Sequence, residues 1–271
     1  MVSVYSHFRQ NASHGEGPTD RDSRLAPARN PERSALGERR GGRGVMTRDA
    51  QRERSFRWTI RRMCGRYDLS ENPAAIRAKF HVPRVPEFTG SADFRPTNVV
   101  PIIRLDRDAK RDCALARWGL VPHWAPDLKF GSKCFNARCE TVATAPSFRA
   151  AVKLRRCLIP MNAFYEWSGP ERQRIRHRIN PVSQNLFAVA GLWEQWGDGE
   201  CVVETYTIIT CTASDALTPI HRRMPVILDD GEYDGWLRDA RMDLLRPYGG
   251  ELVIVPPPVV QNLPEGLFDA G

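Results

Sequence analysis

CLIPMNAFYEW (157–167) is an apolar and aromatic run that ends on a carboxylate and a tryptophan, and it is the first of five such runs. The others are LFAVAGLWEQW (186–196), ETYTIITCTA (204–213), RMPVIL (223–228) and ELVIVPP (251–257). All five are rich in β-branched and aromatic residues, and turn residues separate them, which is the pattern of successive strands. The second half of the chain is therefore expected to be dominated by β-structure.

The first half adds strands and a few helices. VVPIIRL (99–105) and CALARWGLV (113–121) predict two more strands. Helices are predicted in SENPAAIRAKF (70–80), with Ser70 as its N-cap, in APSFRAAVKLRR (145–156) and in GEYDGWLRD (231–239). Many strands with few helices indicate an α+β fold, in which a mainly antiparallel sheet closes into a barrel-like core with flanking helices.

The positive charge of the chain gathers in its first 62 residues. Residues 1–62 hold 14 Arg, no Lys and 7 acids, whereas the remainder has 26 basic and 25 acidic residues. A segment so poor in aliphatic residues cannot bury enough apolar surface to offset its ordering entropy, which predicts a disordered, Arg-rich extension. We interpret it as non-native, from a start codon placed too far upstream. Its RRGGRG patch (39–44) leaves weak nucleic-acid binding as an alternative. Residues 63–271 are expected to form one domain.

The sequence has no apolar run that fits a signal peptide or a membrane span, which predicts a cytoplasmic protein without a membrane partner. Seven cysteines without a secretion signal favour free thiols in a reducing compartment. Four of them lie in apolar surroundings and are predicted to be small core residues: Cys113, Cys157, Cys201 and Cys211. Cys134 and Cys139 lack the spacing of a zinc site, so no metal is expected.

Three polar residues stand out because apolar stretches surround them. Glu166 in AFYEWSG ends a predicted strand, where burial would raise its pKa and make it a proton donor or acceptor near neutral pH. An exposed Glu paired with an Arg is the alternative. His221 in TPIHRRMPVI precedes a strand, a junction where sites collect, although a lone His is often structural. Asn136 in CFNARCET heads a polar cluster with Arg138 and Glu140, or is a turn residue beside an ion pair.

Basic and aromatic residues alternate along the chain, and they include Arg66, Arg138, Arg222 and Arg223 with Trp118, Trp124 and Trp167. Guanidinium groups suit phosphates and aromatic rings suit bases, so the pattern is typical of single-strand binding, although it also occurs on ordinary surfaces. The sequence contains no HExxH, GxSxG, P-loop or strand-linked GxGxxG motif. The sequence therefore gives no motif evidence for the common classes of hydrolase, kinase or dehydrogenase.

Seven motifs taken together resemble the SOS-response-associated peptidase (SRAP) family, the abasic-site DNA–protein crosslinking proteins. They are MCGRYDL, FRPTNVVPI, RWGLVPHWAP, FNARCETV, RRCLIPMNAFYEW, ETYTIIT and IHRRMPVIL. The resemblance runs through most of residues 63–271 in the family's motif order and leaves the extension out. It implies the SRAP fold. In that family the initiator Met is removed and the exposed cysteine, here Cys64, is the reactive residue.

The chemistry that the resemblance implies explains why Cys64 has to be terminal. A free α-amine, with an ordinary pKa of about 7.7–8.0, condenses with the aldehyde of a ring-opened abasic sugar to an imine. The thiol of the same residue then adds to the imine carbon and closes a five-membered thiazolidine. A cysteine that has a peptide bond before it lacks the nucleophilic nitrogen. The extension is incompatible with this chemistry unless translation starts at Met63 or the chain is cut.

The resemblance also implies roles for other positions. Asn136 resembles the asparagine that orients the terminal cysteine and the opened sugar, and Glu166 resembles the glutamate that transfers protons at the amine. His221 resembles the histidine that protonates the sugar oxygen during ring opening. The positions that resemble the family's DNA channel are the phosphate-contacting Arg66, Arg138 and Arg223 and the base-stacking Pro96, Trp118 and Trp167.

These inferences predict a monomeric, cytoplasmic and nucleoid-associated protein that binds abasic sites in single-stranded DNA and crosslinks to them without a cofactor. They predict an enzyme with a cysteine nucleophile and peptidase or lyase-like activity. Cys64, Glu166 and His221 would also remove the preceding residues by autoproteolysis. Two alternatives remain from the sequence. One is a non-catalytic single-stranded-DNA-binding module, and the other is a cysteine peptidase that acts on other proteins, with Cys64 and His221 as a nucleophile–base pair.

Overall fold

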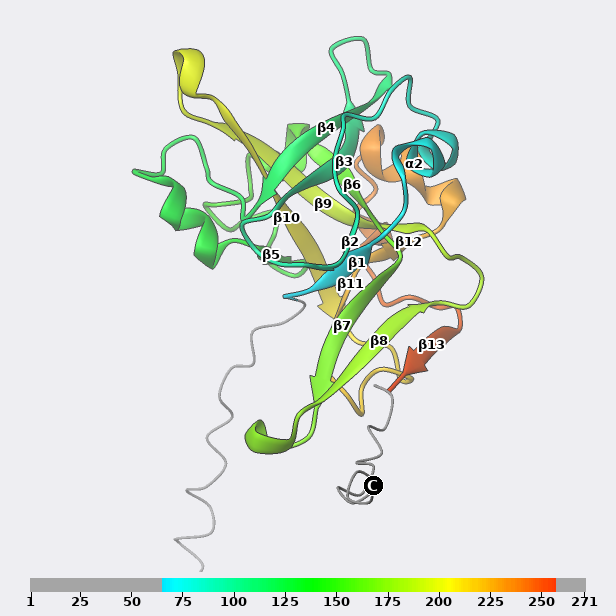
Figure 1. Ribbon diagram of the computed structural model, residues 1–271. Helices are drawn as coiled ribbons and strands as arrows, with labels where there is room; N and C mark the ends of the chain where they lie inside the picture. The colour runs from blue at the N-terminus through cyan, green and yellow to red at the C-terminus, as the bar shows by residue number, and fades with distance from the viewer. Residues whose placement is uncertain (1–64, 257–271) are drawn as a thin grey trace, which may run out of the picture. The chain divides into compact units, whose positions relative to one another are not determined.

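The computed structural model describes residues 65–256, which form two β-sheets with short helices around them (Figure 1). The chain divides into two units, residues 1–57 and 58–271, and all the described residues belong to the second. The predicted extension, residues 1–62, lies outside the described residues. The boundary at residue 63 therefore stays a prediction.

Five strands form a closed barrel. They are β3 (Val99–Leu105), β4 (Arg111–Trp118), β6 (Arg156–Met161), β9 (Phe187–Trp196) and β10 (Val203–Thr212). The order β10-β4-β3-β6-β9 closes because β9 also pairs with β10, from Val203↔Trp196 to Ile208↔Gly191. Only the β4–β10 contact within this ring is parallel. The predicted α+β fold with a mainly antiparallel, barrel-like core is confirmed.

A second sheet of five strands has the order β13-β8-β7-β1-β2. Its members are β1 (Tyr67–Leu69), β2 (Ser91–Phe94), β7 (Ala163–Ser168), β8 (Ile175–Pro181) and β13 (Leu252–Val255). The remaining short strands are β5 (Asn136–Arg138), β11 (Arg223–Pro225) and β12 (Ile227–Leu228). They extend the barrel sheet, because β5 and β11 pair with β10 and β12 pairs with β9.

CLIPMNAFYEW joins the two sheets. Its first part is β6 of the barrel, its last part is β7 of the second sheet, and Asn162 lies between them. The backbone N–H of Asn162 donates to the Asp68 carbonyl at 2.7 Å, and its side-chain oxygen accepts from the Ser70 N–H at 2.9 Å. Its side-chain nitrogen donates to the Asn185 carbonyl at 2.7 Å. This buried amide therefore fixes the point at which the chain leaves the barrel.

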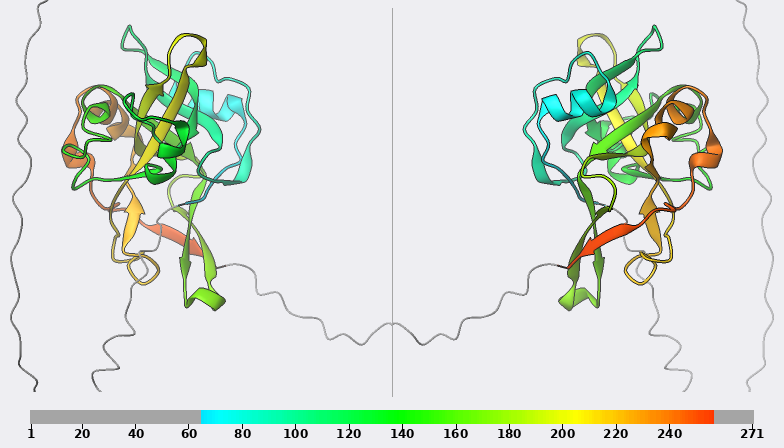
Figure 2. Two further views of the ribbon diagram at one scale, coloured as in Figure 1. Left: turned by 90° about the vertical axis from the view of Figure 1, so that its left-hand side faces the viewer. Right: turned by 90° about the vertical axis from the view of Figure 1, so that its right-hand side faces the viewer.

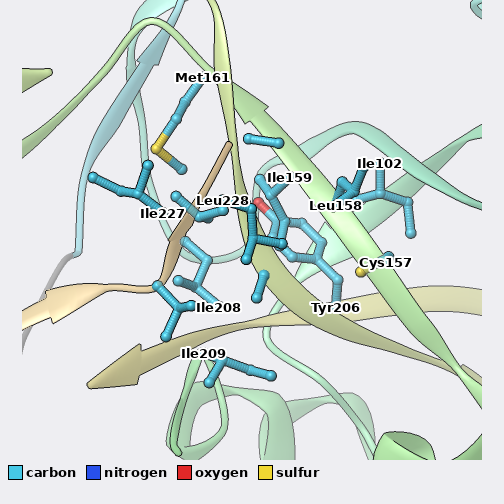
Figure 3. Close-up of a cluster of buried hydrophobic side chains, with 14 of the residues drawn as sticks. Ile102, Cys157, Leu158, Ile159, Met161, Tyr206, Ile208, Ile209, Ile227 and Leu228 are labelled. Carbon is cyan, nitrogen blue, oxygen red and sulfur yellow. The ribbon is translucent and has the colours of Figure 1, made fainter. Parts of the chain in front are cut away.

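Buried apolar side chains of several strands form one cluster (Figure 3). Ile102 of β3, Ile159 of β6 and Ile208 of β10 are all fully buried, and the register places them on the same face of the barrel sheet. Alternate residues of a strand point to opposite faces, so each strand contributes a row of such side chains. Each buried Leu or Ile contributes roughly 1.5–3 kcal/mol relative to an exposed one. The predicted strands therefore supply the core that holds the site in place.

The helices are shorter than the sequence pattern predicts. α2 (Pro73–Phe80) is capped by Asn72, whose side-chain oxygen accepts from the Ala75 N–H at 2.9 Å, so the predicted Ser70 cap is wrong. Pro73 sets this start because proline suits the first helical turn. The other helices are α3 (Ala151–Leu154) and α4 (Tyr233–Leu237), with 3₁₀ turns η2 (Leu128–Lys133), η3 (Glu171–Gln173), η4 (Gly199–Cys201), η5 (Asp230–Glu232) and η6 (Met242–Leu244).

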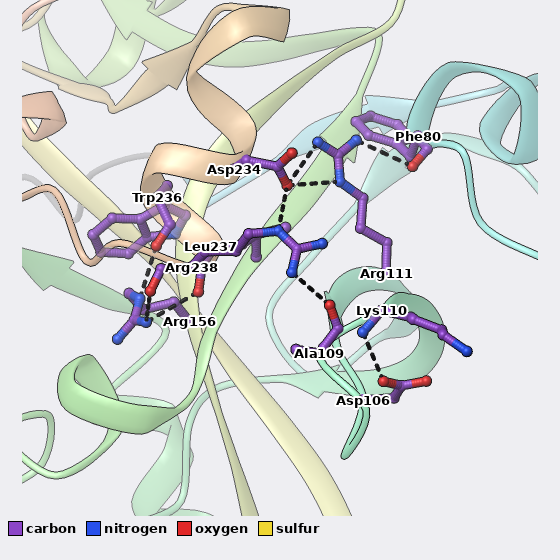
Figure 4. Close-up of polar contacts among 10 residues, drawn as sticks. All are labelled: Phe80, Asp106, Ala109, Lys110, Arg111, Arg156, Asp234, Trp236, Leu237 and Arg238. Atoms are coloured by element: carbon purple, nitrogen blue, oxygen red, sulfur yellow. Dashed lines mark hydrogen bonds and ion pairs between the residues drawn. The ribbon is translucent and has the colours of Figure 1, made fainter.

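The Arg156 guanidinium ties α3 and α4 to the barrel, and Figure 4 shows its contacts with the end of α4. It donates to the Trp236, Leu237 and Arg238 carbonyls at 2.7, 3.0 and 3.3 Å. It also donates to the Val152 and Lys153 carbonyls at 3.0 and 2.7 Å. These carbonyls end two helices, where intrahelical donors are missing. One planar side chain therefore satisfies the ends of both helices.

Arg156→Lys is expected to lower the free energy of unfolding by about 2–4 kcal/mol, because an ammonium group cannot reach both sets of carbonyls and leaves several part-buried acceptors without a donor. Urea denaturation followed by tryptophan fluorescence measures the loss. Arg149→Lys is the control, since Arg149 is exposed and its side chain makes no hydrogen bond or ion pair within residues 65–256. Equal stability of the two variants would show that the carbonyl contacts of Arg156 contribute little.

Candidate functional site

Two strands of the second sheet bring Arg66, Glu166 and Trp167 together. The Tyr165 N–H donates to the Arg66 carbonyl at 3.0 Å, which places the residue before β1 beside β7. The Arg66 guanidinium lies 5.7 Å from the centre of the Trp167 ring and 3.3 Å from an Asp93 carboxylate oxygen. Arg66 and Trp167 therefore form one half-buried, charged and aromatic surface.

Glu166 lies on the opposite face of β7 from Trp167, because successive side chains of a strand alternate. It is 3% exposed, so the prediction that it is buried is confirmed and the alternative of an exposed strand-end glutamate is wrong. Glu166 is directly opposite His177 of β8. The His177 Nε2 lies 2.8 Å from the Ser168 Oγ, and burial lowers the pKa of His177. A buried carboxylate thus faces a histidine that is neutral near pH 7.

Asn136 and Arg138 lie at the two ends of β5, next to the carboxyl-terminal half of β10. Asn136 pairs with Ile208 and Arg138 with Thr210. Asn136 is half-buried and Arg138 is exposed. The backbone N–H of Cys139 donates to the Thr210 carbonyl at 2.9 Å and holds the end of β5. Asn136 is therefore a strand residue, not the turn residue of the alternative interpretation.

His221 lies just before β11, on the other side of β10. Its Nδ1 is 3.2 Å from the Arg223 backbone nitrogen and 3.1 Å from the Arg223 carbonyl oxygen. Its backbone N–H donates to the Leu217 carbonyl at 3.0 Å. Since β11 pairs with β10 through Thr212↔Arg223, the ring lies at the same end of β10 as Arg138. Three separate segments thus converge where β10 ends.

Arg223 is held by a carboxylate rather than presented alone. Its guanidinium makes a two-point ion pair with Glu140 and donates to the Thr210 carbonyl at 2.7 Å. This contact lowers the pKa of Glu140, chiefly through the Arg223 hydrogen bond, so the carboxyl stays ionised. The ion pair expected near Asn136 is formed by Glu140 with Arg223. A phosphate that reached Arg223 would compete with this pair.

The two groups of residues are joined through a buried contact. Tyr67 of β1 and Tyr206 of β10 have their hydroxyl oxygens 2.9 Å apart. Both rings contact Trp118, at centroid distances of 5.2 and 6.2 Å. The Trp118 Nε1 donates to the carbonyl of Phe135, the residue before Asn136, at 2.7 Å. The start of β1 and the β5–β10 pair are therefore held in a fixed relation by packed aromatic rings.

Trp118 is a core residue, and the prediction that it stacks on a base does not fit its position. It is 1% exposed, and the Tyr206 ring covers it at an interplanar angle of 12°. Pro96 is half-buried in the turn before β3, where the Thr97 N–H donates to the Trp118 carbonyl at 2.8 Å. Of the three residues predicted to stack on bases, Pro96 and Trp167 keep exposed surface, whereas Trp118 packs in the core beneath the site.

Cys64 lies outside the described residues. Among the other cysteines, burial raises the pKa of Cys113 and Cys211 to about 12 and raises that of Cys157 further. Such thiols are poor nucleophiles. Cys201 is exposed, so its prediction as a core residue is wrong; it lies in the 3₁₀ turn between β9 and β10, where no partner strand covers it. Within residues 65–256, no group of three or more His, Cys, Asp or Glu could hold a metal ion.

Sequence reasoning did not single out His177, Tyr67 or Tyr206. His177 stands between two arginines in an Arg-rich segment that has little β-propensity, and only its pairing with Glu166 gives it importance. The two tyrosines belong to motifs that sequence reasoning noted for other residues. In the part of the chain that the structure describes, no helix is long and apolar enough to cross a membrane.

Comparison with known proteins shows the family of the chain. Residues 63–259 match the family described as SOS response associated peptidase (SRAP). The abasic site processing protein YoqW of Bacillus subtilis is 38% identical over 202 residues, covering 70% of this chain and 89% of the relative. The abasic site processing protein HMCES of Xenopus tropicalis is 30% identical over 173 residues, covering 54% of this chain and 52% of the relative.

Solved structures share the fold. A protein from Bordetella bronchiseptica superposes with a TM-score of 0.63 at 30% sequence identity, covering 71% of this chain and 99% of that one. A protein from Bacteroides thetaiotaomicron superposes with a TM-score of 0.64 at 22% identity, covering 71% and 91%, and this likeness concerns the fold alone.

Proposed function

Because the chain belongs to the SOS response associated peptidase (SRAP) family, we propose that it processes abasic sites in single-stranded DNA. The observation that carries the proposal is the buried contact of Tyr67 with Tyr206, which joins β1, the neighbour of β7, to β10. β7 carries Glu166, and β10 pairs with β5, which begins at Asn136, and with β11, which follows His221. Cys64 lies one position before the described residues, and we infer that it reacts beside these strands.

The proposed reaction is a condensation at Cys64. Its α-amine attacks the aldehyde of the ring-opened sugar and releases water, which gives an imine. The thiol sulfur then adds to the imine carbon, its proton passes to the nitrogen, and a thiazolidine ring closes. Glu166 accepts and returns the amine protons, His221 protonates the sugar oxygen, and Asn136 orients the opened sugar by hydrogen bonds. No cofactor or metal takes part in these steps.

An N-terminal amine is required, so Met63 and any residue before it must be absent from the reactive molecule. Translation from Met63 with removal of the methionine, or autoproteolysis before Cys64, would each supply that amine. For autoproteolysis we propose that water cleaves the bond before Cys64, with Glu166 and His221 as the acid–base groups. In this proposal the protein is a monomer, and its Arg66, Arg138 and Trp167 bind the DNA. The affinity of the protein for DNA falls as the salt concentration rises.

The test is adduct formation by protein that begins at Cys64. Incubation with single-stranded DNA carrying one abasic site is expected to give a band that survives heating in denaturant, whereas intact DNA gives none. Equal retention of both DNAs without any adduct would favour the non-catalytic binding module instead. A peptidase acting on other proteins would cleave added peptides and leave the DNA unmodified.

Glu166→Gln is expected to slow adduct formation by about a hundredfold or more, because the amide keeps the shape of the side chain but transfers no proton. Single-turnover kinetics with abasic DNA measure the rate, and anisotropy with intact DNA is expected to show unchanged binding. Glu251→Gln, an exposed acid at the start of β13, is the control. An unchanged rate in Glu166→Gln would remove Glu166 from the mechanism.

Glu140→Gln is expected to tighten DNA binding about threefold or more at low salt, because it removes a negative charge and leaves Arg223 available to phosphate. Anisotropy titrations at several salt concentrations measure the change. Glu87→Gln, an exposed acid between α2 and β2, has the same charge change and is expected to leave binding nearly unaltered. Weaker binding by Glu140→Gln would mean that the ion pair orients Arg223 rather than competing with DNA for it.

A further inference from the structure

The outer face of the β7–β8 hairpin carries interleaved aromatic and arginine side chains. Trp167 pairs with Arg176 and Tyr165 with Arg178 across the two strands, so these four side chains share one face. The Arg176 guanidinium lies 4.7 Å from the centre of the Tyr165 ring. Arg66 joins this face through its contact with Trp167. The face therefore continues the surface where DNA binding is proposed.

Toward its tip the hairpin is strongly basic. Residues 172–178 read RQRIRHR, and Glu171 is the acid next to them. Arg172, Arg174 and Arg176 are exposed, and none of them has an ion pair or a side-chain hydrogen bond within residues 65–256. Arg178, at the base of the hairpin, pairs with Asp68 at 3.0 Å. The arginine at the base of the hairpin is therefore neutralised by a carboxylate, whereas the outer three arginines have no carboxylate partner in the described part of the chain.

The surroundings make this concentration of charge local. Residues 65–256 contain 26 basic and 23 acidic residues, so the described part is nearly neutral as a whole. Many of its arginines are paired with carboxylates, among them Arg104, Arg155 and Arg246. The hairpin projects away from the barrel in all three views (Figures 1 and 2). A basic segment that protrudes and lacks carboxylate partners suits an anionic ligand outside the protein.

We propose that residues 171–178, the arginine arm, bind the phosphate backbone of the DNA strand that flanks the lesion on one side. The inference rests on the proposed function and extends its footprint. β7 ends at Ser168, two residues after Glu166, and the arginine arm begins three residues further on, at Glu171, so the arm lies beyond the end of the strand that carries Glu166. Arg174 and Arg176 lie two residues apart and present their guanidinium groups on one face.

The chemistry at the base of the arm favours DNA over a purely solvated surface. Trp167 is half-buried beside the Arg66 guanidinium, and this pair provides stacking for a base and charge for a phosphate. Tyr165 is 4% exposed, so it packs under Arg176 and does not itself meet a base. Contacts to phosphate carry no base preference, so the arm should raise affinity for any sequence. Loss of the arm should leave the rate of the reaction at Cys64 unchanged once the DNA is bound.

The experiment compares protein beginning at Cys64 with its R172Q/R174Q/R176Q variant. The DNA probes are abasic oligonucleotides with two-nucleotide flanks, and the same oligonucleotides extended by eight nucleotides on the 5′ or the 3′ side. Wild-type protein is expected to bind one extended probe about tenfold tighter than the short one, and the variant should lose this gain. The slope of log affinity against log salt for that probe should fall by about 2, at roughly 0.7 for each lost contact with a single strand.

R77Q/R84Q/R107Q is the matched control, because it removes three exposed arginines from α2, the segment after it and the β3–β4 turn, all far from the hairpin tip (Figures 1 and 2). It should behave as wild type. The arm proposal is overturned if both variants lose affinity equally. It is also overturned if the wild-type protein binds the extended probes no more tightly than the short one, or if the arm variant shows the same gain as wild type. Absence of any adduct with wild-type protein would instead refute the proposed function, so the two failures are distinguishable.

Discussion

Gly191→Val is expected to be largely unfolded or insoluble when produced at 37 °C. Gly191 lies in the middle of β9, pairs with Cys157 and Ile208, and is buried in the barrel wall. A Cβ at this position would be 2.8 Å from the Thr207 carbonyl oxygen and 3.1 Å from the Cys157 Sγ, and it would overlap the end of Ile159. The side chain of Ile159 can rotate away, but the carbonyl belongs to the neighbouring strand and can move only if the barrel opens.

The stability of Gly191→Val shows whether side-chain packing or β-strand propensity dominates at this position. Valine is among the best strand formers, so propensity alone predicts stabilisation. Overpacking costs about 3 kcal/mol or more in a well-packed core, a large share of a total stability of roughly 5–15 kcal/mol. A drop in melting temperature of about 6 °C is the smallest expected change. Calorimetry or thermal fluorescence measures it.

Gly249→Val is the control, because a Cβ at Gly249 meets no atom within 4 Å. It should melt near the wild-type temperature. If Gly191→Val did so as well, β9 and β10 would be able to separate without loss of stability, and the closed barrel would not be what holds the core together.

The fold class could be read from the sequence because the strand signals are strong and repeated. The predicted runs at 186–196 and 204–213 coincide with β9 and β10 to within one residue at each end. The run at 157–167 is two strands of different sheets, which composition cannot show, since the break at Asn162 depends on hydrogen bonds to Asp68 and Ser70. Non-local contacts of this kind leave no local pattern.

β8 was missed for a different reason. Its sequence IRHRINP has three charged or titratable residues in its first four positions and a proline at its end, so it has little β-propensity. It is a strand because β7 and β13 pair with both of its edges. The arginines that make β8 hard to predict from the sequence are the same residues that we propose to bind phosphate in the arginine arm.

The candidate site could be predicted in part. The aromatic residues around Glu166 left a buried and an exposed glutamate equally open, and the structure shows that Glu166 is buried. The sequence pattern could not distinguish a stacking tryptophan from a supporting one. Trp118 is the last residue of β4 and Trp167 the last but one of β7, yet Trp118 is covered by Tyr67 and Tyr206. Which ring remains exposed depends on residues more than 50 positions away, and only the folded structure brings them together.

The largest functional effect is expected when the amine of Cys64 is blocked while its thiol is kept. Protein that begins at Cys64 should form the heat-stable adduct in full yield. The same protein acetylated on its N-terminal nitrogen should form none that survives denaturation. An acylated nitrogen cannot make the imine, and the thiol alone gives a thiohemiacetal that reverts to thiol and aldehyde.

The series is completed by Cys64→Ser and by protein that keeps Met63. Cys64→Ser retains the amine but lacks the sulfur, so it should give an imine that is lost on heating unless a hydride donor reduces it first. Protein that keeps Met63 should be unreactive until the methionine is removed, and intact mass spectrometry shows whether removal has occurred. If the acetylated protein, with its mass confirmed, still formed the stable adduct, the thiazolidine could not be its linkage, and the proposed mechanism would have to be replaced by one that uses the thiol alone.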